Sequence, residues 1–178
     1  MNLAALEALD VQPGERILEV GFGGGDLLGR LLGGGAGEVI GVDPSNAMVG
    51  RARRRYRKES RLRLIEASVT AMPLPDCAVD KACSVNSLYF WANLDAAAWE
   101  LARVIRPGGK LVLCFQTPQS VRAWPGHRHG FHAWEEEEIA SAVEAAGFGD
   151  LASTPGSDRK LGEFVCLSAV RAGNERLG

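Results

Sequence analysis

The sequence predicts one α/β domain in which a doubly wound, mostly parallel sheet has helices on both faces. Three observations predict this fold class. Apolar runs typical of strands alternate with segments of helical periodicity, a glycine-rich stretch follows the first run, and a turn rather than a helix joins the last two runs. Because helical crossovers join parallel strands and a hairpin reverses the chain, only the C-terminal end of the sheet should be antiparallel.

The elements of the N-terminal half follow from apolar spacing and turn residues. Leu3, Leu6 and Leu9 recur at helical spacing, so a short amphipathic helix precedes the Pro13-Gly14 turn. Beyond that turn we expect, in order, a strand at 16–21, a helix at 26–32 that ends in the glycines of 33–37, a strand at 38–43, a helix from a Ser45 cap to about residue 58, and a strand at 62–66.

The C-terminal half continues the alternation and then departs from it. We expect a strand at 80–86, a helix through Leu94, Ala98, Leu101 and Ile105 that the 107–109 Pro-Gly-Gly stretch ends, a buried strand at 110–115, and a helix at 135–146. Four consecutive glutamates open that last helix, where the helix dipole favours negative charge. The final strands, at 148–153 and 163–171, should form a hairpin.

The composition fits a single domain over residues 1–178. Of these residues 46% are hydrophobic and 24% are charged, and the net charge of -2 provides no general attraction to nucleic acid. The run of basic residues at 51–58 is interpreted as a solvated helix face, with contact to an anionic partner or nucleic acid as the alternative. No apolar run approaches the ~20 residues of a membrane helix, and no signal peptide is visible. We therefore expect a cytoplasmic protein without membrane contact, whose four cysteines are free core thiols.

The glycine-rich loop after the first strand is the predicted ligand-binding floor. Glycines at alternate positions let a ligand lie against bare backbone amides at a helix N-terminus. The third glycine of a dinucleotide fingerprint would fall at position 26, which is Asp26, and a carboxylate there suits a cationic ligand better than a diphosphate. Glu19 adds a second carboxylate, and Asp43 at the end of the second strand suits ribose hydroxyls. These features favour a nucleoside without phosphates over a nicotinamide dinucleotide.

Four ordered motifs resemble those of a known family. ILEVGFGGG, VIGVDPSNAM, EASVTAMPLPDCAVDKACSVNSLYFW and LARVIRPGGKLVLCF are similar to the class I S-adenosylmethionine-dependent methyltransferases, especially the ubiquinone and menaquinone biosynthesis branch. The resemblance covers nearly the whole chain. It implies a Rossmann-like fold, S-adenosylmethionine as methyl donor and S-adenosylhomocysteine as product. It also implies that these residues bind the cofactor: Glu19, Gly21, Phe22, Gly23, Asp43, Pro44, Met48, Ser68, Val69 and Asn86.

The implied roles follow the parts of the cofactor. The backbone from Gly21 to Gly23 would line the methionine moiety, with Glu19 supporting that loop, and the ribose would lie on Asp43. The adenine would lie near the residue pairs 44/48 and 68/69. Ser68 stands where the family usually has an aspartate, so we expect weaker adenine recognition. The Asn86 carbonyl would meet the amino group of the ligand.

Methyl transfer needs an aligned acceptor more than a dedicated base. Weak candidates for a catalytic role are Tyr89 and His127, and candidates for acceptor contact are Tyr89, Trp91, Trp124 and His129. Trp91 has an alternative role in packing, and a solvated loop is the default for the histidines. The spacing of the three histidines matches no standard metal motif, so we expect no metal site.

The sequence therefore predicts a methyltransferase that acts on a small-molecule acceptor. The alternative is a non-catalytic module that binds S-adenosylmethionine or S-adenosylhomocysteine as a regulatory or partner subunit, which Ser68 and the short N-terminus favour. Because the first strand begins by Arg16, the N-terminal cap is minimal and the site should be open. We expect the segment at 116–134, a second copy or another partner chain, or the substrate itself to complete it.

Overall fold

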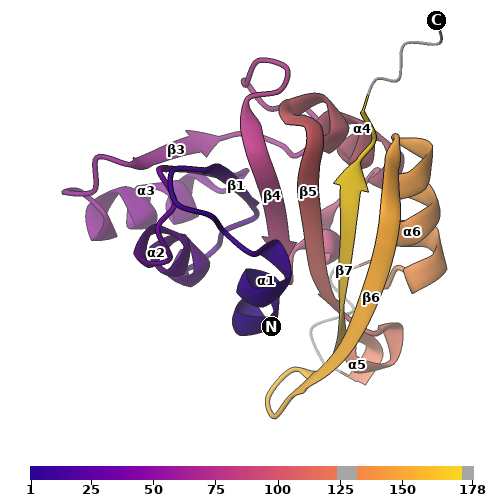
Figure 1. Ribbon diagram of the computed structural model, residues 1–178. Coiled ribbons are helices and arrows are strands. Elements are labelled where there is room, and N and C mark those ends of the chain that lie inside the picture. The colour runs from indigo at the N-terminus through magenta and orange to yellow at the C-terminus, as the bar shows by residue number, and fades with distance from the viewer. Residues whose placement is uncertain (124–131, 174–178) are drawn as a thin grey trace, which may run out of the picture.

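The computed structural model describes residues 1–123 and 132–173. These residues form a seven-stranded sheet in the order β3-β2-β1-β4-β5-β7-β6 (Figure 1). The strands are β1 (Arg16–Val20), β2 (Glu38–Asp43), β3 (Leu62–Glu66), β4 (Val79–Val85), β5 (Ile105–Gln116), β6 (Phe148–Asp158) and β7 (Gly162–Arg171).

The strand directions confirm the predicted fold class. The β1 strand pairs in parallel with β2 and β4, and the parallel set extends to β3 on one side and β5 on the other. The β7 strand runs antiparallel to both β5 and β6. The predicted hairpin is present and longer than expected, because both of its strands reach the turn at 159–161.

Six α-helices and one short 3-10 helix occur in the described residues. They are α1 (Asn2–Leu9), α2 (Asp26–Gly33), α3 (Asn46–Arg55), η1 (Leu88–Phe90), α4 (Leu94–Val104), α5 (Pro118–Ala123) and α6 (Glu136–Ala145). Within the ranges that the structure describes, none of these helices is long and apolar enough to cross a membrane. The Ser45 cap is confirmed, since its hydroxyl accepts the Met48 N–H at 3.4 Å.

Two buried clusters cover the two faces of the sheet. On one face α4 and α6 pack against the strands, and on the other face α1, α2 and α3 do so. Adjacent residues of β1 alternate between the clusters: Leu18 belongs to the first, and Ile17 to the second. Because Glu19 shares the parity of Ile17, its carboxylate is directed to the face covered by α1 to α3.

One local expectation needs correction, and one helix was not expected. The Pro-Gly-Gly stretch at 107–109 does not follow the end of a helix directly, because α4 ends at Val104 and these residues already belong to β5. A Cβ on Gly109 would collide with the Asp80 carbonyl, so the close approach of β4 requires glycine there. The α5 helix was not predicted, because its six residues are too few to show a periodicity.

The expectation of four free thiols is wrong for two of the cysteines. Cys114 on β5 and Cys166 on β7 are directly opposite each other in the antiparallel register. Their Cα atoms are 4.1 Å apart, and the structure joins the side chains as a disulfide. Cys77 and Cys83 are free, but Cys77 is exposed and so is not the core thiol that was expected. The pairing depends on strand register, which cysteine spacing along the chain does not show.

Candidate functional site

The glycine loop between β1 and α2 is hydrogen-bonded to the end of β2. The Gly21 N–H donates to the Val42 carbonyl at 2.7 Å, and the Gly23 N–H donates to Asp43 Oδ2 at 2.9 Å. Asp43 Oδ1 accepts the Ser45 N–H, also at 2.9 Å, and the Asp43 residue is only 6% exposed. These two hydrogen bonds hold the Asp43 carboxylate in place. Because each of its oxygens retains a second acceptor position, it can still accept hydrogen bonds from hydroxyl groups.

The basic end of α3 supports the same loop from outside. Arg55 donates to the Gly24 carbonyl at 3.0 Å and to Asp26 Oδ1 at 2.7 Å, and the Tyr56 hydroxyl donates to the Gly25 carbonyl at 2.6 Å. The ion pair with Arg55 revises the interpretation of Asp26, whose charge is partly neutralised before any ligand arrives. Part of the basic run therefore positions the loop, and Glu19 and Asp43 are left as the carboxylates that define its charge.

Glu19 is the most unusual polar group of the site. The residue is 3% exposed, and its Oε2 atom is buried without a hydrogen-bond partner among the described residues. Burial raises the pKa of Glu19 well above its ordinary value, and the nearby Asp43 and Asp26 carboxylates raise this pKa further. A buried carboxylate without a partner is costly unless a cation satisfies it. The α-amino and sulfonium groups of S-adenosylmethionine have the required charge, so the residues present fit this cofactor.

Glu19→Gln should stabilise the ligand-free protein, and the gain should grow with pH. Because the folded-state pKa of Glu19 is raised, the stability that the protonated carboxyl contributes is fully present below the unfolded-state pKa and is lost as the pH rises through the folded-state value. Glutamine imitates the protonated form at every pH. We expect a gain of about 1–3 kcal/mol near neutral pH, measured by thermal unfolding between about pH 5 and pH 8.

Glu7→Gln on the exposed face of α1 is the matched control, and it should leave unfolding unchanged. The Glu19→Gln gain should be accompanied by weaker S-adenosylhomocysteine binding, because the amide carries no charge. A Glu19→Gln protein that is less stable than wild type across the whole pH range would show that the carboxylate has a partner in the ligand-free state.

The residues predicted to contact the adenine differ in exposure. Pro44 and Ser68 are exposed, Met48 is half-buried, and Val69 is buried. The Ser68 hydroxyl accepts the Thr70 N–H at 3.2 Å and lies 2.9 Å from Thr70 Oγ1, so local turn contacts already involve it. The Phe22 side chain is buried in the core beneath the glycine loop, so this residue would meet a ligand through its backbone.

The ends of β1 and β4 meet beside the loop. Asn86 follows β4 with a left-handed backbone at φ 58°, and its N–H donates to the Cys114 carbonyl at 2.8 Å. The buried Ser84 and Ser87 hydroxyls lie 2.5 Å apart, and Ser87 Oγ donates to the Val20 carbonyl at 3.4 Å. These contacts fix Asn86 at the carboxyl edge of the sheet, next to the glycine loop.

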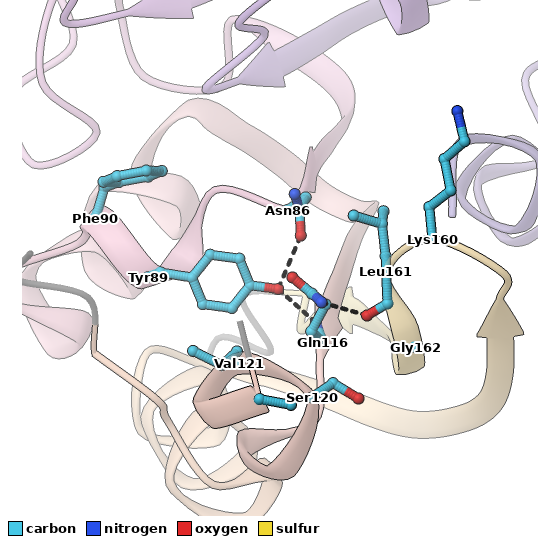
Figure 2. Close-up of a pocket in the computed structure, with 10 residues that line it drawn as sticks. Asn86, Tyr89, Phe90, Gln116, Ser120, Val121, Lys160, Leu161 and Gly162 are labelled. Atoms are coloured by element: carbon cyan, nitrogen blue, oxygen red, sulfur yellow. Dashed lines mark hydrogen bonds between the residues drawn. The ribbon is translucent and has the colours of Figure 1, made fainter. Parts of the chain in front are cut away.

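A cavity of about 520 Å³ opens on the other side of Asn86. Its walls come from Asn86 after β4, η1, the end of β5, α5 and the tip of the β6–β7 hairpin (Figure 2). The lining residues are Asn86, Tyr89, Phe90, Gln116, Ser120, Val121, Ala123, Lys160, Leu161 and Gly162. Of the predicted cofactor residues only Asn86 lines this cavity, so Asn86 connects the proposed cofactor floor to a separate space.

Tyr89 lies at the centre of this connection. Figure 2 shows its hydroxyl between Asn86 and Gln116: it donates to Asn86 Oδ1 at 3.0 Å and accepts the Gln116 N–H. Burial raises the pKa of Tyr89 to about 12, although the Gln116 hydrogen bond lowers it in part. The phenol therefore keeps its proton at physiological pH. A role as general base is therefore disfavoured for Tyr89, and its contact with an acceptor stays a prediction.

The remaining acceptor candidates have different placements. Trp91 is buried in the core against α4 and α6, which favours its packing role. Trp124, His127 and His129 lie outside the described residues. In the described part of the chain, no group of three histidine, cysteine, aspartate or glutamate side chains could hold a metal ion.

Sequence reasoning found part of the cavity wall. Tyr89 was a candidate for acceptor contact, and Gln116, Ser120 and Val121 fall in the segment at 116–134 that was expected to complete the site. Lys160 and Leu161 were missed, because only the pairing of β7 with β5 brings the tip of the hairpin to this cavity.

Comparison with known proteins agrees with this architecture. The sequence profile of the Methyltransferase domain family matches residues 18–113. The uncharacterized methyltransferase YdaC of Bacillus subtilis is 32% identical over 152 residues, which are 85% of this chain and 81% of YdaC. The ubiquinone/menaquinone biosynthesis C-methyltransferase UbiE of Shewanella oneidensis is 36% identical over 120 residues, 64% of this chain but only 48% of UbiE.

A solved structure supports the same assignment at the level of the fold. An S-adenosylmethionine-dependent methyltransferase from Mesorhizobium loti superposes with a TM-score of 0.80 at 20% identity, covering 95% of this chain and 96% of that one. The fold is the Rossmann-like fold of the class I methyltransferases. The chain belongs to the methyltransferase domain family, as the four sequence motifs predicted, and it is a methyltransferase of the S-adenosylmethionine-dependent class.

Proposed function

We propose that this chain binds S-adenosylmethionine at the glycine loop and transfers its methyl group to a small molecule in the cavity beyond Asn86. The observation that carries the proposal is the buried Glu19 carboxyl group beside the glycine loop, whose Oε2 atom has no hydrogen-bond partner in the described part of the chain. When a cationic nucleoside binds, the ionised Glu19 would supply its counter-charge. A diphosphate would gain no such counter-charge there.

The contacts of these residues indicate the role of each in binding and transfer. S-adenosylmethionine, when bound, supplies an electrophilic methyl carbon. Asp43 would accept the ribose hydroxyls, and Glu19 would neutralise the positive end of the ligand. Tyr89 holds Asn86, and this bond fixes the boundary between cofactor and acceptor. The cavity walls orient the acceptor, which is the main requirement for an in-line displacement.

The test is release of S-adenosylhomocysteine from S-adenosylmethionine in the presence of a panel of small acceptors. We expect turnover with at least one acceptor and methylated product in the mass spectrum. Tight S-adenosylhomocysteine binding without turnover over a broad panel would favour the non-catalytic binding module instead. Tight nicotinamide dinucleotide binding without S-adenosylhomocysteine binding would contradict both.

A further inference from the structure

The polar atoms that line the cavity are largely engaged within the protein. The Gln116 side chain donates to the Leu161 carbonyl, while its backbone N–H donates to Tyr89 (Figure 2). Ser120 Oγ accepts the Glu163 N–H at 3.0 Å and lies 3.1 Å from Thr117 Oγ1. Because these groups already have partners, a ligand in the body of the cavity gains little from polar contacts with them.

Apolar side chains complete the walls. Phe90 is 65% exposed at the cavity, Leu161 is 37% exposed at the hairpin tip, and the buried Val121 of α5 also belongs to the lining. Exposed side chains of this size, gathered around a cavity, favour an apolar ligand body. The hairpin tip is held there by the bonds of Gln116 and Ser120.

The described lining of the cavity carries positive charge and no negative charge. Lys160 is the only charged side chain among the described lining residues. Its ammonium makes no ion pair or side-chain hydrogen bond with the described part of the chain, although it interacts electrostatically with Asp158, whose pKa is lowered mainly by the backbone N–H groups of Lys160 and Leu161 and further by this ammonium. In Figure 2 its stem rises beside Leu161 with the ammonium directed away from Tyr89, at the edge of the cavity. The acid of the same hairpin, Asp158, caps the turn by accepting the N–H groups of Lys160 and Leu161, and it lines a neighbouring cavity with Met1.

We propose that the acceptor is a compact apolar molecule that carries an anionic group, with its apolar body between Phe90, Val121 and Leu161 and its anion at Lys160. A cationic amine in this cavity would lose water without gaining a counter-ion from the described lining. The Lys160 stem is flexible enough to meet a carboxylate at the rim. This inference rests on the proposed function, because it takes the cavity beyond Asn86 as the acceptor site.

The test uses three probes of similar shape: phenylacetate, phenylacetamide and phenethylamine. Their dissociation constants are measured by calorimetry on the protein saturated with S-adenosylhomocysteine. We expect phenylacetate to bind about tenfold more tightly than phenethylamine, with phenylacetamide between them. Lys160→Gln should weaken the binding of phenylacetate about two- to fivefold and leave the affinity for phenylacetamide unchanged. Lys58→Gln, at an exposed lysine after α3, is the matched control and should change neither.

Leu161→Trp should weaken the binding of all three probes, because the larger side chain fills the cavity. It should leave the affinity for S-adenosylhomocysteine unchanged. Phenethylamine binding as tight as that of phenylacetate, or a Lys160→Gln protein with unchanged phenylacetate affinity, would overturn the inference. Failure of all three probes to bind while S-adenosylhomocysteine binds would overturn it as well, without touching the proposed function. Failure of S-adenosylhomocysteine to bind the wild-type protein would overturn the proposed function itself.

Discussion

Gly21→Ala should destabilise the protein by about 2–5 kcal/mol and remove measurable cofactor binding. Gly21 has φ 72°, and a Cβ at this position would lie 2.5 Å from Ser87 Cβ and 2.6 Å from Ser87 Oγ. The left-handed conformation costs an alanine about 1–2 kcal/mol, and overpacking against the end of β4 costs about 1–3 kcal/mol more. The displaced loop would also misplace the amides that face the ligand. Chemical unfolding and calorimetric titration with S-adenosylhomocysteine measure the two effects.

The glycine loop provides its own controls. Gly23→Ala has open space around the added Cβ, but the residue has a φ of 48°. Its stability should therefore fall only by the cost of the left-handed conformation, about 1–2 kcal/mol. Gly24→Ala has neither the positive φ nor a neighbour within 4 Å, and its stability should be near that of wild type. Adding Ser87→Gly to Gly21→Ala removes the side chain that the new Cβ would meet. The double variant should therefore recover the stability that Gly21→Ala loses through overpacking. Equal losses at positions 21 and 24 would contradict the geometry described for the loop.

Asp43→Ala should weaken S-adenosylhomocysteine binding by about 1–3 kcal/mol. The Asp43 carboxylate holds the Gly23 and Ser45 N–H groups, and its remaining acceptor positions are proposed to receive the ribose hydroxyls. Removing it therefore removes both a ligand contact and a support of the glycine loop. Calorimetry at a temperature well below the unfolding transition of the variant measures the loss of affinity.

Two further variants separate these contributions. Ser45→Ala removes the helix cap without touching the carboxylate, so it should reduce stability and leave affinity almost unchanged. Glu144→Ala, at an exposed position of α6, should change neither quantity. If Asp43→Ala bound S-adenosylhomocysteine as tightly as wild type does, the ribose would have to lie elsewhere.

Periodicity and turn chemistry were sufficient to predict the order of the sheet elements. The bounds predicted for β2 and β3 match those of the structure, because charged residues and turns delimit short apolar runs there. The glycine loop was predictable for a different reason: its backbone conformation at Gly21, Gly23 and Gly25 has positive φ, which restricts the residue type directly. Features encoded locally were thus visible in the sequence.

Contacts between distant segments were not predictable in this way. The pairing of Cys114 with Cys166, the ion pair of Asp26 with Arg55, and the contact of the hairpin tip with Gln116 all depend on register or on the path of a connection. A single sequence reports which side chains are polar, but it does not report which partners neutralise them. For this reason the glycine loop and the segments after β4 and β5 were predicted from the sequence, while the contribution of the β6–β7 hairpin to the cavity was not.

The central claim, that the glycine loop binds an S-adenosyl nucleoside, is tested most directly by calorimetric titration of the wild-type protein with S-adenosylhomocysteine and with a nicotinamide dinucleotide. We predict saturable binding of one S-adenosylhomocysteine per chain and no detectable binding of the dinucleotide. Saturable binding of the dinucleotide together with no heat from S-adenosylhomocysteine would contradict the claim.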